Sequence, residues 1–192
     1  MGNTFRSSHT SNNIENGQPV LTQPRLLTKK EKKRLKKTWL ALGEKQQDFF
    51  REVWLTAATR SPRVRAILGV DTEEGEKSER FTKLNNAVRD FFEELIVRHK
   101  LHNELVLESC YMLGLRHSQF HESVFQPIYW DIFLVSLTDV MERTDIKGVS
   151  NDKRWCVVYT WRKFAHLVVN QMLEAYRGTR LGDIISAGDD DV

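Results

Sequence analysis

The chain has 192 residues, 40% of them hydrophobic, which suits one globular domain with additional tail. Its net charge is only +3, and its basic residues are neither spread over a face nor interleaved with aromatic side chains, which argues against nucleic-acid binding. Two cysteines without metal-ligand spacing, and no apolar run of about 20 residues, predict a cytoplasmic protein without a membrane span.

The amino-terminal residues 1–27 are rich in Ser, Asn, Gln and Thr and predict a disordered tail. The start, Met1-Gly2-Asn3-Thr4-Phe5, resembles an N-myristoylation signal. Arg6 stands where Ser or Thr is usual, and Ser7 follows it. Gly2 is therefore a predicted lipidation site.

A strongly basic segment follows this tail. Residues 25–37 hold eight basic residues and one acid, so the segment carries +7 and the remainder of the chain −4. One acyl chain binds membranes marginally, and a polybasic segment supplies the second signal that stable attachment needs. The two features together predict attachment to an anionic membrane surface. The alternative interpretation of the basic segment is a solvated helix start.

Between the tails, residues 28–176 repeat their apolar side chains with a helical period. Thr28 and Glu31 form a candidate capping box for the first helix. Pro62 is placed to open a short third helix. The predicted inward positions are Leu35, Trp39 and Leu42 in the first helix, and Phe50, Val53, Trp54 and Ala57 in the second.

The second half of the chain continues this pattern. A long apolar stripe runs from Phe81 to Leu95, and Asn103 could cap the helix that ends at His117. Pro127 lies near the start of the next helix, and Asn151 or Asp152 could cap the last one. Residues 177–192 predict an acidic carboxyl-terminal tail. Strand-like alternation is absent, so the predicted fold is all-α.

The most informative motif is Leu113-Gly114-Leu115-Arg116-His117-Ser118-Gln119-Phe120. It places a histidine at the end of an apolar helix, just before a corner. A haem iron needs such a neutral imidazole on a rigid element facing an apolar slot. Leu113 lies four residues before His117 on the same helix face, where a flat porphyrin could rest on it.

With this motif, the ordered set of helices resembles the globin family, and the divergent, nematode-type invertebrate globins most of all. The likeness spans roughly residues 27–176. It rests on the inward Trp39, the helix opened by Pro62, the start of a helix at Ser78-Glu79-Arg80-Phe81, and the Leu-Gly-x-x-His-x-x-Phe pattern. The resemblance implies a globin-like bundle of about seven to eight helices.

The resemblance also implies a site for haem b. His117 would be the proximal iron ligand, and Leu113, Leu84, Val88, Trp54 and Leu68 would bind the cofactor. Two residues depart from the usual globin pattern. Leu84 stands where His or Gln is common, and it offers no hydrogen bond to a ligand. Leu68 stands where a phenylalanine ring usually packs on the porphyrin.

The sequence thus favours a haem-binding globin with an apolar distal pocket. Its ligands would be diatomic gases (O2, NO or CO), and its role intracellular redox or oxygen sensing, or electron transfer. The alternative is a globin-fold interaction module that is poor in haem and tethered to a membrane by its amino terminus. An enzyme is not expected, because no distal acid–base residue accompanies His117.

Overall fold

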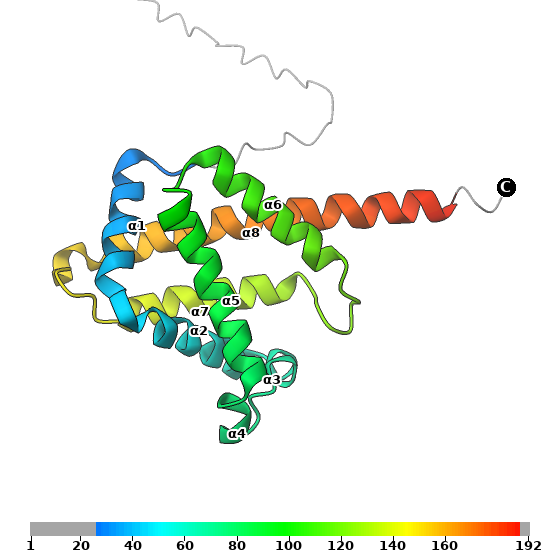
Figure 1. Cartoon of the computed structure of the whole chain (residues 1–192), viewed down its shortest axis with the longest axis horizontal. Coiled ribbons are helices and arrows are strands. Elements are labelled where there is room, and N and C mark those ends of the chain that lie inside the picture. The colour runs from blue at the N-terminus through cyan, green and yellow to red at the C-terminus, as the bar shows by residue number, and fades with distance from the viewer. Residues whose placement is uncertain (1–25, 189–192) are drawn as a thin grey trace, which may run out of the picture.

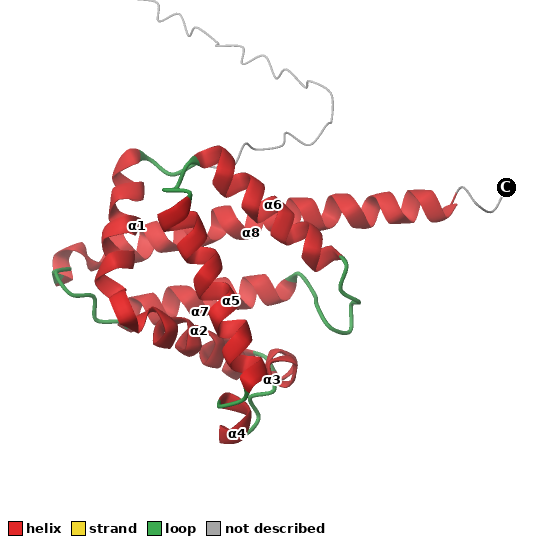
Figure 2. Ribbon diagram, viewed as in Figure 1, coloured by secondary structure: helices red, strands yellow, loops and turns green. Residues whose placement is uncertain are grey.

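The computed structural model describes the backbone of residues 26–188, and the side chains of this range through residue 179 except residue 151. Within it the fold is an all-α bundle, with no strand among the described residues (Figure 2). Its elements are α1 (Lys29–Leu42), η1 (Gly43–Lys45), α2 (Gln46–Arg60), α3 (Pro62–Leu68), α4 (Glu73–Glu76), α5 (Glu79–Glu93), η2 (Glu94–Arg98), α6 (Asn103–Ser118), α7 (Ile128–Arg143) and α8 (Asn151–Gly188). The predicted fold class is therefore confirmed.

The first helix begins as its sequence predicts. The Thr28 backbone N–H donates to Glu31 Oε2 at 2.7 Å, and the Glu31 N–H donates to Thr28 Oγ1 at 3.3 Å. This capping box satisfies backbone donors that the first turn cannot pair internally. Leu35, Trp39 and Leu42 are buried on the inner face of α1, as expected from their spacing.

Hydroxyl caps fix the starts of the short elements that follow. Ser61 Oγ accepts the Val64 N–H at 3.2 Å and Pro62 is the first residue of α3. Ser78 caps α5 in the same way through the Phe81 N–H at 3.2 Å. These caps set the direction of α5, which crosses the bundle in front of α7 and α2 (Figure 1).

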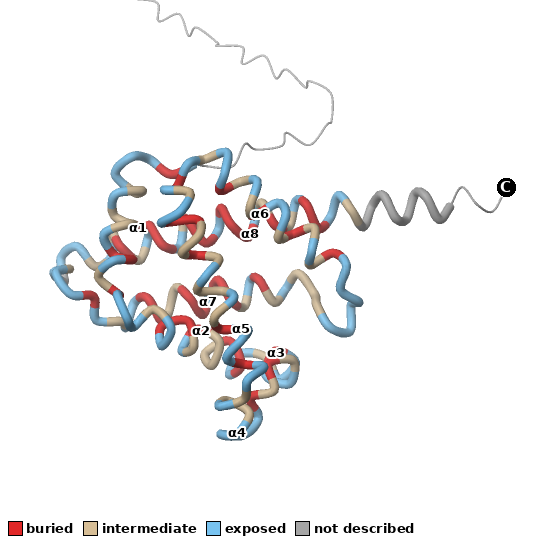
Figure 3. The backbone as a smooth tube through the Cα atoms, viewed as in Figure 1, coloured by how far each residue is buried: buried red, intermediate tan, exposed pale blue. Residues whose placement is uncertain are grey.

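The core is built around the fully buried Trp161 of α8. Its ring lies near those of Trp39 and Phe92, with centroids 6.3 and 6.1 Å away. Its Nε1–H donates to Thr38 Oγ1 at 2.8 Å, so the one polar atom of this indole is satisfied inside the core. Buried segments of α1, α2, α7 and α8 face one another around this centre (Figure 3).

Helices α6 and α8 approach each other closely at Gly114. A Cβ at this position would lie 2.8 Å from the Met172 Cα and carbonyl carbon, and nearer still to its carbonyl oxygen. Only glycine permits this backbone approach. Because His117 follows one turn later on α6, the glycine also fixes how deeply that histidine sits against the bundle.

The structure differs from expectation at three boundaries. The N-cap of α6 is His102, and Asn103 instead accepts a hydrogen bond from Lys32 Nζ at 2.7 Å. Leu27, assigned to the tail by composition, is buried in the core. Helix α8 continues to Gly188 and projects beyond the bundle (Figure 1), although residues 177–192 were predicted as tail. None of the described helices is both long and apolar enough to cross a membrane.

Candidate functional site

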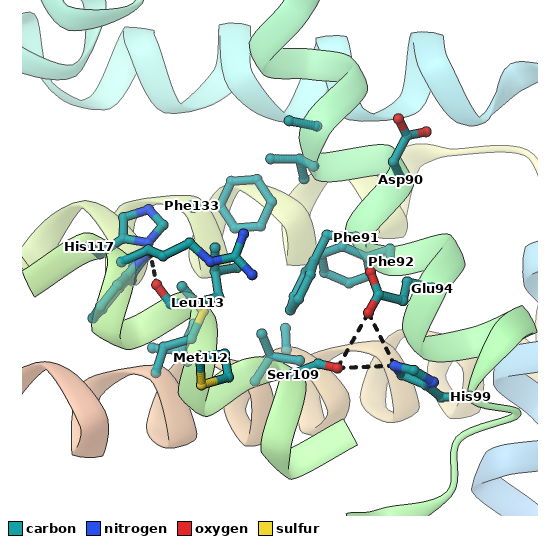
Figure 4. Close-up of a pocket in the computed structure, with 18 of the residues that line it drawn as sticks. Asp90, Phe91, Phe92, Glu94, His99, Ser109, Met112, Leu113, His117 and Phe133 are labelled. Carbon is teal, nitrogen blue, oxygen red and sulfur yellow. Dashed lines mark hydrogen bonds and ion pairs between the residues drawn. The ribbon is translucent and has the colours of Figure 1, made fainter. Parts of the chain in front are cut away.

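A cavity of about 770 Å³ lies between α5 and α6, with α7 and α8 behind it. Its lining is predominantly apolar. The structure brings together five of the six residues predicted to bind the cofactor or its iron: Trp54, Leu84, Val88, Leu113 and His117 all line this cavity. Leu113 and His117 lie at one end of it in Figure 4, and Phe91 and Phe92 lie farther along.

Leu68, the sixth residue predicted at the site, does not line this cavity. It is buried at the end of α3, in a separate apolar cluster with Val64, Val70 and Phe81. The prediction counted along the chain from Pro62. Leu68 is instead buried by the placement of α3, which ends at this residue and is capped by Gly69 with φ of +69°.

His117 is held in one orientation by its own helix. Its Nδ1 lies 2.8 Å from the carbonyl oxygen of Leu113, one turn earlier on α6. A carbonyl oxygen can only accept, so Nδ1 carries the proton and Nε2 keeps its lone pair. No described residue hydrogen-bonds to Nε2. Metal-ligating histidines commonly have this arrangement, in which the second ring nitrogen donates to a carbonyl.

Aromatic rings surround the imidazole. Its centroid lies 4.8 Å from that of Phe125, 5.3 Å from Trp130 and 5.7 Å from Phe120, each at a steep angle. Burial among these rings lowers the pKa of His117, although the bond to the Leu113 carbonyl opposes this and the Arg116 charge adds to it. The side chain is therefore neutral near pH 7, which is the form that binds a metal.

Trp54 lines the cavity and carries a buried polar atom without a partner. Its ring packs on Phe133 at a centroid distance of 4.8 Å, and its buried Nε1–H has no hydrogen-bond partner. A buried donor without an acceptor costs about 1–3 kcal/mol. Trp161, by contrast, has its indole N–H paired. Trp54 therefore lines the cavity and keeps one buried, unpaired donor, as Tyr129 does outside the cavity lining.

The cavity is also bordered by uncovered apolar side chains. Leu84 on α5 is 38% exposed, and Leu105 and Met112 on α6 are 42% and 47% exposed. These three residues come from the two helices that form the sides of the opening. An apolar occupant between α5 and α6 would remove their surface from water, at about 25 cal/mol per Å².

A polar cluster that the sequence analysis missed lies at the other end of the cavity (Figure 4). His99 Nε2 lies 3.1 Å from Glu94 Oε1 and 3.0 Å from Ser109 Oγ. Glu94 and Ser109 therefore contact the same ring nitrogen of His99. A catalytic nucleophile–base–carboxylate relay uses the two ring nitrogens separately, one for the nucleophile and one for the carboxylate. Glu94 opens the π-helical turn η2, and no periodicity in the sequence reveals that turn.

Among described residues, no group of three or more His, Cys, Asp or Glu side chains is placed to hold a metal ion. Burial raises the pKa of Cys110 to about 12, which keeps its thiol protonated. Gly2, the predicted lipidation site, lies outside the described residues.

No protein-family model matches this chain, and no curated protein is detectably similar to it in sequence. Assignment of the cavity therefore rests on its own residues. They provide an oriented neutral imidazole, an apolar slot and one unpaired donor.

Proposed function

We propose that this protein is a globin-like haem protein and that its cavity holds haem b, with His117 as the axial ligand of the iron. The observation that carries the proposal is the hydrogen bond from His117 Nδ1–H to the Leu113 carbonyl at 2.8 Å. It fixes the tautomer and ring orientation and leaves the Nε2 lone pair for a metal.

The cavity suits this cofactor in shape and chemistry. Leu113 is placed one turn from His117 to support a flat ring, and Leu84 and Val88 line the α5 side. The three exposed apolar residues, Leu84, Leu105 and Met112, would be covered by the ring. When bound, haem would supply an iron atom that coordinates small ligands, while the protein supplies the axial nitrogen and a dry surrounding.

The residues around the proposed ligand position favour diatomic gases, O2, NO or CO. Leu84 and Val88 offer no ligating atom and no donor, so the position facing His117 stays open to an external ligand. Trp54 also lines the cavity, and its unpaired Nε1–H would be a donor for a polar diatomic if the ring turned toward the ligand. Such a pocket suits redox or oxygen sensing, or electron transfer, better than bulk oxygen transport.

The test is a haem titration of the purified protein followed in the Soret region. The wild type should bind one haem per chain, and His117→Ala should lose the stable complex. His121→Ala is the matched control, because His121 is exposed and hydrogen-bonds only locally to Ser123. His117→Gly with added imidazole should recover the wild-type spectrum if the variant keeps its helical circular dichroism. Equal haem binding by His117→Ala and His121→Ala would refute the ligand assignment.

A second candidate function is a haem-poor interaction module tethered to a membrane by its amino terminus. The specific observation in its favour is Leu84 on α5, which is exposed. Leucine stands there where globins commonly have a His or Gln that can hydrogen-bond to an iron-bound ligand. The same titration separates the two functions. A folded wild type that produces no Soret band with excess haem would favour the interaction module.

A further inference from the structure

We propose that the outer face of α1 is a docking surface for an anionic membrane leaflet. Four lysines supply charge and two flanking leucines supply apolar contact. The proposal depends neither on haem in the cavity nor on an acyl chain at Gly2. It concerns described residues only, and its surface lies at one end of the bundle, whereas α6 runs toward the other end (Figure 1).

The face is a single helical stripe. At 3.6 residues per turn, its members within α1 fall inside an arc of about 100°. All are exposed, and they are Lys29, Lys30, Lys33, Lys37 and Leu40. The opposite arc holds Leu35, Trp39 and Leu42, which are buried in the core. The helix is thus anchored on one side and presents a row of ammonium groups on the other.

No described residue neutralises the charge of this row. The only acid of α1, Glu31, faces inward and pairs with Lys163 at 2.9 Å. The inward-lying Lys32 and Arg34 hydrogen-bond to side chains of other helices. Among the described residues, none of the four outer lysines has an ion-pair or hydrogen-bond partner.

Two exposed lysines, one directly after the short helix α4 and one in α5, differ from this row. Lys77 and Lys83 each pair with a glutamate four residues earlier, at 3.9 and 2.7 Å. In α1 the same spacing instead brings lysine next to lysine, as at Lys29, Lys33 and Lys37, and such like-charge pairs destabilise a helix. An external array of negative charges would attract these lysines and offset their mutual repulsion.

The leucines at the ends of the row distinguish a membrane from other polyanions. Leu40 is 74% exposed at the end of α1, and Leu26 is 40% exposed just before its start. Lysine stems and leucine side chains can enter the interfacial region of a bilayer while the ammonium groups stay at the headgroups. A nucleic-acid backbone would match the lysines and leave both leucines without apolar surroundings.

The test is cosedimentation of the full-length, non-acylated protein with vesicles. One set contains phosphatidylserine and the other phosphatidylcholine alone. Each lysine near an anionic leaflet contributes about fivefold to partitioning, so changing all four outer lysines to glutamine should lower binding by about 600-fold. The control replaces Lys77, Lys83, Lys147 and Lys153 by glutamine, which removes the same charge from exposed sites outside α1. Circular dichroism establishes that both variants are folded.

The proposal requires three results together: binding only to phosphatidylserine vesicles, loss in the α1 variant, and retention in the control. Leu40→Asn should also weaken binding at constant charge. Equal loss in the α1 and control variants would show a net-charge effect and overturn the proposal. No binding by the wild type would overturn it too, as would preferential binding to a DNA or RNA oligonucleotide over the vesicles. Haem binding is measured in a separate titration, so none of these vesicle results bears on the proposed cofactor.

Discussion

Substituting Gly114 by alanine should separate α6 from α8 and weaken the fold. The new methyl carbon would lie 2.8 Å from two backbone atoms of Met172, and nearer to a third. Ordinary carbon contacts begin at about 3.5 Å. The obstacle is helix backbone, so no side-chain rotation can relieve the overlap, and the two helices must move apart.

The expected magnitude follows from two opposing terms. Overpacking of a well-packed interface costs about 1–3 kcal/mol. Replacing a helical glycine by alanine returns about 1 kcal/mol through helix propensity. Because the overlap involves backbone, we expect the first term to exceed the second, with a net loss of about 1–2 kcal/mol of unfolding free energy. His117 lies on the displaced segment, so haem affinity should also fall.

Gly178 provides a matched control on α8. It is helical and exposed, and a Cβ there would meet nothing within 4 Å. Gly178→Ala should therefore stabilise the protein by about 0.5–1 kcal/mol, the propensity term alone. Urea denaturation without added haem, followed by circular dichroism, measures both variants. If Gly114→Ala is as stable as Gly178→Ala, the close approach of α6 and α8 is refuted.

Three further outcomes are expected. Thr38→Val leaves the buried Trp161 N–H without its acceptor and should cost about 1–3 kcal/mol in urea denaturation, whereas Thr38→Ser should be much milder; equal losses would contradict the role of this hydrogen bond. The pKa of His117 is lowered in the folded state, so its contribution should be complete above the ordinary value of about 6.5 and decline as pH falls below it toward the lowered value. Wild type should then lose stability on acidification faster than His117→Gln, and parallel pH profiles would argue against a buried neutral imidazole. Gly2→Ala should shift the protein toward the soluble fraction in cells able to myristoylate, and an unchanged distribution would argue against acylation.

Much of the helical layout can be predicted from the sequence because its signals are local. The capping box at Thr28 and Glu31 and the proline that opens α3 each act within one turn. The inward stripes follow from helical periodicity alone, which is why Trp39 and Phe50 are found buried as expected. Boundaries that depend on tertiary contacts were less predictable. Leu27 is buried through packing that no local pattern encodes.

For the candidate site, too, relations within one helix could be predicted and relations that depend on tertiary packing could not. His117 and Leu113 lie on one helix at a fixed spacing, so their relation follows from helix geometry. Leu84, Val88 and Trp54 required only the correct helix faces. The position of Leu68 could not be predicted in this way, because it depends on how α3 packs against its neighbours. The contact of His99 with Glu94 and Ser109 depends on the π-helical turn of η2, for which single-sequence periodicity carries no signal.

The polar atoms around the cavity form a physical argument for an occupant. In the core, the Trp161 N–H finds an acceptor at 2.8 Å. At the cavity, the buried Trp54 N–H has none, and His117 uses only its Nδ1. An unpaired buried donor is destabilising. Haem held by His117 would supply a metal to the free Nε2, and its ring would cover the exposed wall of Leu84, Leu105 and Met112.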